Sequence, residues 1–238
     1  MKLKIEVCFT PSEYKNENYE NFTAVVIDVL RATTSIATAF HNGCRQIVPV
    51  EEVHTAFEKK EQLYPEAILA GERKGLLITG FNFGNSPLEY NRGAVEDKTI
   101  IMTTTNGTMA LNMASSGQKV YAAAFVNARA VCDRLIQEGR PVVILCAGTD
   151  GRFSVEDAVC AGLIAERLKH HYQLSDKALA VQAMYEAYKG SLLERVGQSS
   201  HARYLTELGF AADVILCLEQ DVFSVAPVFT NGVLKIEL

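Results

Sequence analysis

Three stretches of the chain pass from an apolar run, through a short polar turn, into a segment with helical spacing. Their apolar runs cover residues 24–29, 99–104 and 142–147. Apolar runs without alternation are typical of strands buried on both faces of a sheet. In open α/β sheets the ligand lies where such strands end, and the free N–H groups of the next helix favour an anion. The pattern therefore predicts an α/β protein with a site for a small anionic molecule.

The remaining pattern predicts a layered sheet, mixed or parallel, flanked by helices. We expect strands over residues 2–9, 24–29, 46–50, 67–71, 99–104, 119–124, 142–147 and 213–218. We expect helices over residues 32–42, 52–63, 106–116, 127–138, 154–172, 175–188 and 200–208. The similar strand–turn–helix units near residues 24 and 99 suggest an internal duplication. No linker rich in Pro, Ser or Gly divides the chain, so we expect one unit over residues 1–238. This unit consists either of one lobe or of two closely packed lobes.

Residues 72–93 depart from this pattern. Gly, Asn, Ser and Pro are dense over residues 80–87, which predicts a long irregular loop. Long structured loops in compact domains are usually functional. We therefore expect this loop to belong to the site.

Composition narrows the class of protein. An apolar content of 48% with 21% charged residues is ordinary for a globular domain. The net charge of −5 argues against a nucleic-acid partner, which needs a basic face. No apolar stretch is long enough to span a bilayer, so we expect no membrane partner. The six cysteines are scattered without a C-x-x-C pair, which favours reduced thiols and a cytoplasmic protein.

Acidic and basic residues stand together at the ends of two predicted strands. Asp28 lies late in an apolar run, where a carboxylate is costly unless it is paired or binds a metal. It is either half of an ion pair with Arg31 that caps the helix or a functional carboxylate. Glu72, Arg73 and Lys74 follow another strand between glycines. They can hold both a metal and an acidic substrate, or form a charged surface turn.

Two further turns offer hydrogen-bond donors. The hydroxyl-rich residues 103–108 lead into a helix, and their hydroxyls, the Asn106 amide and free N–H groups would suit phosphate or sulfonate oxygens. A helix cap is present there in either case. Residues 148–157 contain two glycines and a basic residue before Glu156 and Asp157 in a first helical turn. Consecutive residues on a helix diverge by about 100°, so we expect only one of these acids to point into the site.

Cys146 and Arg152 have the C-x5-R spacing of cysteine-dependent phosphatases. Asp150 within the turn would repel phosphate, and Leu145 stands where such enzymes carry a histidine. An inert, buried Cys146 is therefore the favoured interpretation. His201, at the start of a predicted helix, is either a weak oxyanion contact or structural.

Together these segments resemble the 2-phosphosulfolactate phosphatase family, the ComB-like proteins. The resemblance rests on residues 28–33, 71–75, 80–87, 104–108 and 148–157. It is dense over residues 20–165 and looser beyond. Each segment alone is a weak signal, whereas their order and spacing together are specific.

The resemblance implies an Mg²⁺-dependent phosphomonoesterase with a distinctive α/β fold, and a homodimer. The implied reaction converts (2R)-2-phospho-3-sulfolactate to sulfolactate and phosphate, in coenzyme M biosynthesis or related sulfolactate production. Mg²⁺ prefers hard oxygen ligands, which Asp28, Glu72 and one of Glu156 or Asp157 can supply. We expect catalysis to depend on Asp28, Glu72 and Arg31. The expected substrate-binding residues are Arg73, Lys74, Thr104, Thr105, Asn106, Gly107, Gly148 and Arg152.

Two alternatives stay open at this point. One is a metal-independent thiol phosphatase that uses Cys146 and Arg152, whose activity would survive a chelator. The other is a non-catalytic binder of a small sulfonated or phosphorylated acid. The acidic residues among the cations argue against a simple binder, because nearby carboxylates repel an anion.

Overall fold

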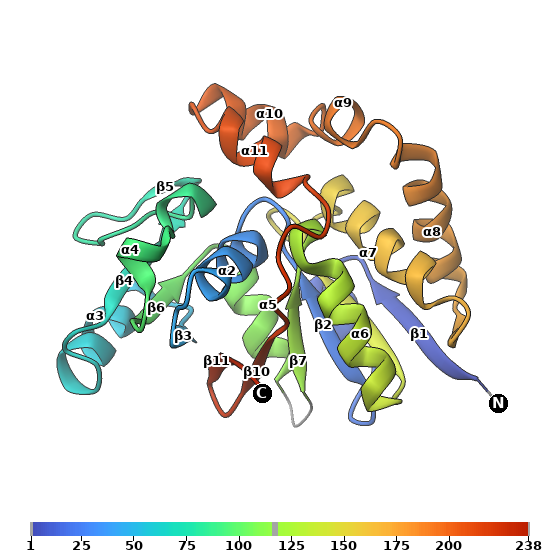
Figure 1. Ribbon diagram of the computed structural model, residues 1–238, viewed down its shortest axis with the longest axis horizontal. Coiled ribbons are helices and arrows are strands. Elements are labelled where there is room, and N and C mark those ends of the chain that lie inside the picture. Colours follow the sequence, from blue (N-terminus) through green and yellow to red (C-terminus); the bar gives the residue numbers. More distant parts are fainter. Residues whose placement is uncertain (1, 116–118, 238) are drawn as a thin grey trace.

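The computed structural model describes residues 2–115 and 119–237. Within them, an eleven-stranded mixed sheet is covered by helices on both faces (Figure 1). This confirms the predicted α/β class with a mixed sheet flanked by helices. The internal duplication and the single unit over residues 1–238 stay predictions.

The strands follow the chain as β1 Leu3–Cys8, β2 Thr23–Ile27, β3 Gln46–Pro49, β4 Ile68–Arg73, β5 Leu76–Leu77, β6 Thr99–Thr103, β7 Val120–Ala123, β8 Val142–Cys146, β9 Tyr172–Leu174, β10 Pro227–Thr230 and β11 Val233–Ile236. The α-helices are α1 Pro11–Lys15, α2 Ala32–His41, α3 Val53–Gln62, α4 Arg92–Val95, α5 Gly107–Ala114, α6 Ala128–Glu138, α7 Val155–Leu168, α8 Asp176–Tyr188, α9 Leu192–Val196, α10 Ser200–Glu207 and α11 Ala211–Cys217. Two 3₁₀ turns, η1 Pro87–Glu89 and η2 Phe125–Asn127, complete the set.

A hairpin near the end of the chain joins two parallel sets of strands. The sheet order is β5-β4-β6-β3-β11-β10-β7-β2-β8-β1-β9. The strands β4, β6 and β3 pair in parallel, as do β7, β2, β8, β1 and β9. Between the two sets, the red hairpin β10–β11 pairs antiparallel with β7 on one side and β3 on the other (Figure 1). Three antiparallel pairings separate the sets, so their strands run in opposite senses.

Alternate residues of the central strands pack into two separate cores. Val25 and Ile27 of β2 face one core with α6, α7 and α8, whereas Ala24 and Val26 face another with α2 and α5. All five residues of β2 are therefore buried. This double burial explains why the apolar run does not alternate with polar residues.

Most predicted elements are confirmed, with ends shifted by a few residues. The prediction of a strand over residues 213–218 is wrong, because Ala211–Cys217 forms helix α11. Its buried residues Asp213, Val214 and Cys217 have helical spacing. A short apolar run does not by itself distinguish a strand from a buried helix. Residue 116, the last of the helix predicted over 106–116, lies outside the described residues.

Other differences lie at edges and loops. The helix predicted over 154–172 ends at Leu168, and Tyr172–Leu174 instead forms strand β9 beside β1. The irregular loop predicted over 72–93 is partly ordered, because β4 runs on to Arg73 and pairs with β5. The hairpin β10–β11 was not predicted. Its turn is Asn231-Gly232, with φ angles of 51° and 81°, a dipeptide that signals a tight hairpin.

Two further expectations concern the state of the cysteines and the presence of membrane-spanning helices. All six cysteines are free and buried. Among the described residues, none of the helices combines the length and apolar character needed to cross a bilayer.

Gly162 of α7 allows the close contact between α7 and α8. A Cβ atom at this position would lie 2.0 Å from the carbonyl oxygen of Val181. We expect Gly162→Ala to lower the free energy of unfolding by about 1–3 kcal/mol, because one helix must move away from the other. Urea denaturation measures the change, and Gly190→Ala, which meets no atom within 4 Å, is the control. Equal stability of the two variants would contradict this account.

Candidate active site

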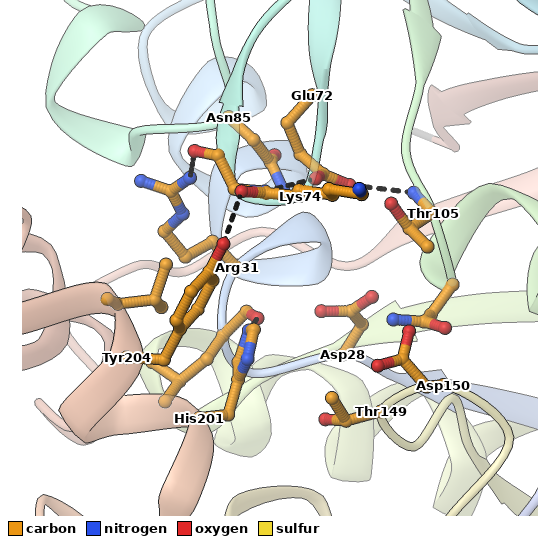
Figure 2. Close-up of a pocket in the computed structure, with 14 residues that line it drawn as sticks. Asp28, Arg31, Glu72, Lys74, Asn85, Thr105, Thr149, Asp150, His201 and Tyr204 are labelled. Carbon is orange, nitrogen blue, oxygen red and sulfur yellow. Dashed lines mark hydrogen bonds between the residues drawn. The ribbon is translucent and has the colours of Figure 1, made fainter. Parts of the chain in front are cut away.

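Six chain segments surround one cavity of about 320 Å³. The turns after β2, β6 and β8, the β4–β5 turn, the loop before η1 and helix α10 all contribute side chains (Figure 2). The lining residues are Asp28, Leu30, Arg31, Glu72, Lys74, Gly75, Asn85, Thr105, Asn106, Thr149, Asp150, His201, Tyr204 and Leu205. The cavity is thus assembled from parts far apart in the sequence.

Asp28 follows β2 directly and is only 7% exposed. Its Oδ1 accepts a hydrogen bond from the Ala32 amide, 3.1 Å away at the start of α2. A Cβ on Gly107 would lie 2.8 Å from the other carboxylate oxygen, so only glycine lets α5 begin this close. Burial raises the pKa of Asp28 to about 6, and the negative charges of Glu72 and Glu156 add to the rise.

Glu72, near the end of β4, uses both carboxylate oxygens to join two turns. Oε2 accepts from the Gly75 amide and Oε1 from the Thr105 amide, each at 2.7 Å. These bonds hold the β4–β5 turn against the turn after β6. Carboxylate oxygens have further lone pairs, so Glu72 can still accept a bond or bind a cation from the cavity.

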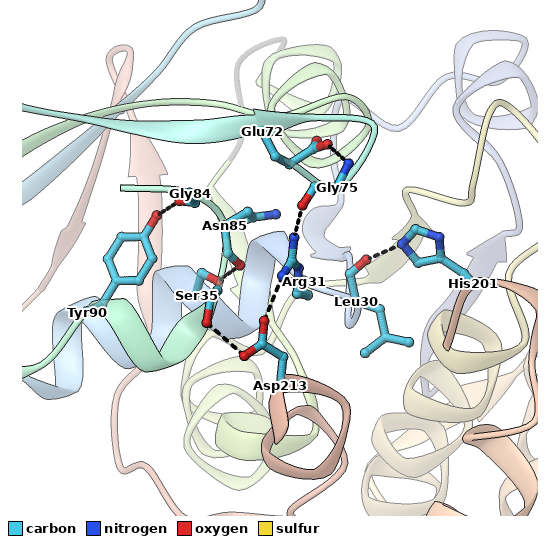
Figure 3. Close-up of polar contacts among 11 residues, drawn as sticks. Leu30, Arg31, Ser35, Glu72, Gly75, Gly84, Asn85, Tyr90, His201 and Asp213 are labelled. Carbon is cyan, nitrogen blue, oxygen red and sulfur yellow. Dashed lines mark hydrogen bonds and ion pairs between the residues drawn. The ribbon is translucent and has the colours of Figure 1, made fainter. Parts of the chain in front are cut away.

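Arg31 pairs with a residue distant in sequence. Its guanidinium lies 2.6 Å from Asp213 of α11 and 2.7 Å from the Gly75 carbonyl oxygen (Figure 3). It also lies over the Phe210 ring. The hypothesis of an Asp28–Arg31 ion pair is therefore wrong. Arg31 borders the cavity, but its charge is balanced by a buried carboxylate.

The two other basic residues of this region separate. Lys74 lines the cavity, and its carbonyl oxygen accepts a bond from the Tyr204 hydroxyl at 2.9 Å. Arg73 lies outside the cavity lining, where it donates to the carbonyl oxygens of Glu72 and Glu51. Arg73 is the last residue of β4, whereas Lys74 lies in the following turn with a φ of 53°, so the two side chains leave the backbone in different directions.

The turn after β6 places part of the predicted anion site in the cavity. Thr105 and Asn106 line it. Thr104 instead bonds Thr108 within the first turn of α5, where its Oγ1 accepts from the Thr108 amide at 3.1 Å. Gly107 opens α5 beside Asp28 and permits that close approach.

The turn after β8 differs from expectation in its acidic residues. Asp157 is buried, and its oxygens accept from the amides of Val29 and Gly148 at 2.9 and 3.0 Å. Burial, followed by the charge of Asp28, holds the pKa of Asp157 well above its usual range. Neither Glu156 nor Asp157 lines the cavity, so the expectation that one of them points into it is wrong. Thr149 and Asp150 line it instead.

The C-x5-R segment does not form an anion cradle. The Cys146 side chain packs in the core beneath α7, and burial raises the pKa of its thiol well above the usual value. Arg152 is exposed and lies outside the cavity lining. Its backbone closes a tight turn with Thr149, and Gly148 allows that turn because a Cβ there would lie 2.3 Å from the Arg152 carbonyl oxygen.

Helix α10 supplies three lining residues, His201, Tyr204 and Leu205, of which the sequence pattern singled out only His201. Its Nε2 lies 2.9 Å from the Leu30 carbonyl oxygen, which can only accept, so this nitrogen carries a proton. Tyr204, one helical turn later, was missed because an aromatic residue on an amphipathic helix resembles any other. Asn85 was missed as an individual residue, although the Gly- and Asn-rich loop around it was a visible signal.

Fold and cavity define an α/β protein with a polar cavity where strand ends meet helix starts. Comparison with known proteins assigns it more narrowly. The family model described as 2-phosphosulpholactate phosphatase matches residues 8–232. The chain therefore belongs to the 2-phosphosulpholactate phosphatase family.

Similar proteins from several bacteria support this assignment. A probable 2-phosphosulfolactate phosphatase of Clostridium acetobutylicum is 39% identical over 97% of this chain and 99% of its own length. One of Thermotoga maritima is 43% identical over 89% of this chain and 90% of its own length. One of Clostridium novyi is 38% identical over 95% of this chain and 97% of its own length.

Loss of the Asp213 charge should destabilise the protein. In Asp213→Asn the Arg31 guanidinium stays buried without a counter-charge, so we expect the free energy of unfolding to fall by about 3–5 kcal/mol. Urea denaturation at neutral pH tests this. Glu96→Gln, which breaks an exposed pair with Arg92, is the control and should change stability by less than about 1 kcal/mol. A similar small change in both variants would show that the buried pair contributes little.

Proposed function

We propose that the protein hydrolyses (2R)-2-phospho-3-sulfolactate to (R)-3-sulfolactate and phosphate, with Mg²⁺ as its cofactor. The observation that carries the proposal is that Asp28 and Glu72 line the same cavity as Lys74 and the start of α5. Metal-binding oxygens and anion-binding groups therefore face one small molecule. The names of the related proteins support the choice of substrate.

The cavity suits a substrate with several anionic groups. Phosphate, sulfonate and carboxylate all accept hydrogen bonds. Lys74 offers a positive charge, and Thr105 and Asn106 offer side-chain donors beside the start of α5. These groups would bind and orient the substrate, and Arg31 would support them by holding the Gly75 turn in place.

The charges of the lining favour a cation within the site. Asp28, Glu72 and Asp150 would repel a polyanionic substrate unless a cation screens them. Burial is the main cause of the raised pKa of Asp28, and the negative charges of Glu72 and Glu156 add to the rise. In the described part of the chain, no three His, Cys, Asp or Glu side chains are arranged to enclose a metal. Mg²⁺ commonly uses only one or two carboxylates, with waters and substrate phosphate completing its shell, so Asp28 and Glu72 fit it.

The positions of these groups indicate a separate role for each. Bound Mg²⁺ would polarise the phosphoryl group and lower the pKa of a water molecule. Asp28 is held ready by the Ala32 amide, and Glu72 by the Gly75 and Thr105 amides, so neither must reorganise. Lys74 and the start of α5 would stabilise the negative charge that develops on the phosphoryl oxygens.

We also propose a cellular compartment, an oligomeric state and a metabolic role, each from indirect support. Reduced, buried cysteines fit a reducing compartment, so we propose a cytoplasmic enzyme. The homodimer and the role in coenzyme M biosynthesis or related sulfolactate production rest on the family resemblance. The thiol mechanism is not favoured, because the Cys146 thiol is buried away from the cavity and Arg152 is exposed.

The first test is phosphate release from racemic 2-phosphosulfolactate, with Mg²⁺ and with excess EDTA. We expect release with Mg²⁺ and none in EDTA. Asp28→Asn should lower kcat/KM at least about a hundredfold, because it removes a charged metal ligand. Its melting temperature should not fall, since the neutral amide relieves buried repulsion.

Cys146→Ser is the control and should keep its activity, provided that it stays folded. Release that survives EDTA and disappears in Cys146→Ser would move the mechanism to the thiol. Tight binding of substrate without any release would instead indicate the non-catalytic binder.

The pH profile should report the proton on Asp28. Below about pH 6 this carboxyl becomes neutral and binds a metal poorly, so at limiting Mg²⁺ we expect kcat/KM to fall about tenfold per pH unit. Saturating Mg²⁺ competes with the proton and should move the acid limb to lower pH. Initial rates across the pH range at two Mg²⁺ concentrations measure both effects. An acid limb that does not move with Mg²⁺ would contradict the assignment of Asp28 as a ligand.

A further inference from the structure

The segment Gly84–Asn85–Ser86 is held in place by three buried hydrogen bonds from different elements (Figure 3). The Tyr90 hydroxyl donates to the Gly84 carbonyl oxygen at 2.8 Å. The Ser35 hydroxyl of α2 donates to the Asn85 carbonyl oxygen at 2.8 Å. The Ser86 hydroxyl donates to Asp213 of α11 at 2.7 Å. The backbone on both sides of Asn85 is therefore fixed relative to the site.

The side chain of Asn85 is not used by this network. The residue is 4% exposed and lines the cavity beside Glu72 (Figure 2). Its Oδ1 is buried and has no hydrogen-bond partner. No described residue accepts a hydrogen bond from its Nδ2, and Figure 3 shows the carboxamide pointing away from Tyr90, toward the side of Arg31 and Gly75.

The unpartnered Oδ1 is a buried acceptor, which costs free energy in the folded protein, whereas Nδ2 is the donor of the same carboxamide that is left for a group in the cavity. Most buried carboxamides avoid this cost by forming hydrogen bonds within the protein. Here the surrounding bonds hold the backbone so firmly that the side chain stays at the cavity wall. Such an arrangement is typical of a group prepared for a ligand, because its orientation is set before binding.

We propose that Asn85 is a substrate-binding residue whose Nδ2 donates a hydrogen bond to an anionic oxygen of the substrate. The proposal rests on the proposed function for the identity of that substrate. Phosphate, sulfonate and carboxylate share the chemistry that an amide donor recognises. Ser86 and Asp213 act as positioning residues, because they hold the segment that carries Asn85.

Asn85→Asp tests the proposal with almost no change of volume, since it replaces the donor by a charged acceptor. Asn82→Asp is the matched control. Asn82 lies in the same loop, outside the cavity lining, and its Oδ1 accepts from the Leu69 amide, a bond that aspartate can keep. We expect KM for 2-phosphosulfolactate to rise roughly tenfold to a hundredfold in Asn85→Asp and to stay within about twofold in Asn82→Asp.

A second substrate identifies the group that Asn85 contacts. 2-Phospholactate has the phosphate and the carboxylate but lacks the sulfonate. An equal rise of KM for both substrates would support contact with the phosphate or the carboxylate. A rise only for the sulfonated substrate would support contact with the sulfonate. An unchanged KM for both, in a variant that melts at the wild-type temperature, would overturn the proposal.

Binding measurements separate this proposal from the proposed function. Calorimetric titration with racemic 3-sulfolactate and with inorganic phosphate, each with Mg²⁺, needs no turnover. If the wild-type protein releases no phosphate from 2-phosphosulfolactate, the proposed function fails. Weaker binding in Asn85→Asp than in Asn82→Asp would then still support Asn85 as a ligand-binding residue.

Equal affinities in the two variants, or no binding by the wild-type protein, would overturn the proposal. If Asn85→Asp does not fold, Asn85→Ala takes its place. Loss of the donor alone should still weaken binding roughly tenfold.

Discussion

The buried ion pair between Arg31 and Asp213 is the interaction on which the site depends. Arg31 belongs to the turn after β2, and its second contact is the Gly75 carbonyl oxygen in the turn after β4. Asp213 lies on α11 and uses its other oxygen to accept from Ser86. One pair of charges therefore joins three segments of the cavity wall. Because both groups are buried, neither can lose its partner without a large cost in free energy.

Carboxylates in this protein divide into those that hold loops together and those that face the cavity. Asp157 accepts two backbone amides and joins the turns after β2 and β8. Glu72 joins two other turns in the same way but also lines the cavity. Asp28 accepts a hydrogen bond from one backbone amide, and its other oxygen lies close to the start of α5. The number of lone pairs that the backbone already occupies thus determines whether such a carboxylate can still bind a group in the cavity.

Local signals predicted most of the fold, because buried strands and amphipathic helices have periodicities that survive in any context. They failed where local sequence is ambiguous, as in the apolar run of α11. For the site, the pattern pointed to the turns around Asp28, Glu72 and Thr105, which the structure brings together around one cavity. It did not separate Lys74 from Arg73, because only the geometry of the strand end decides which of two neighbours faces the cavity.

The sequence by itself determined the class of fold, the turns that carry the polar residues and the family to which the chain belongs. These properties depend on local composition, spacing and order along the chain. The tertiary structure alone decided which side chains meet. The partner of Arg31 lies at position 213, and the segment that positions Asn85 is held from positions 35, 90 and 213. Long-range contacts of this kind leave no periodic trace in the sequence, because each depends on packing between elements that are distant along the chain.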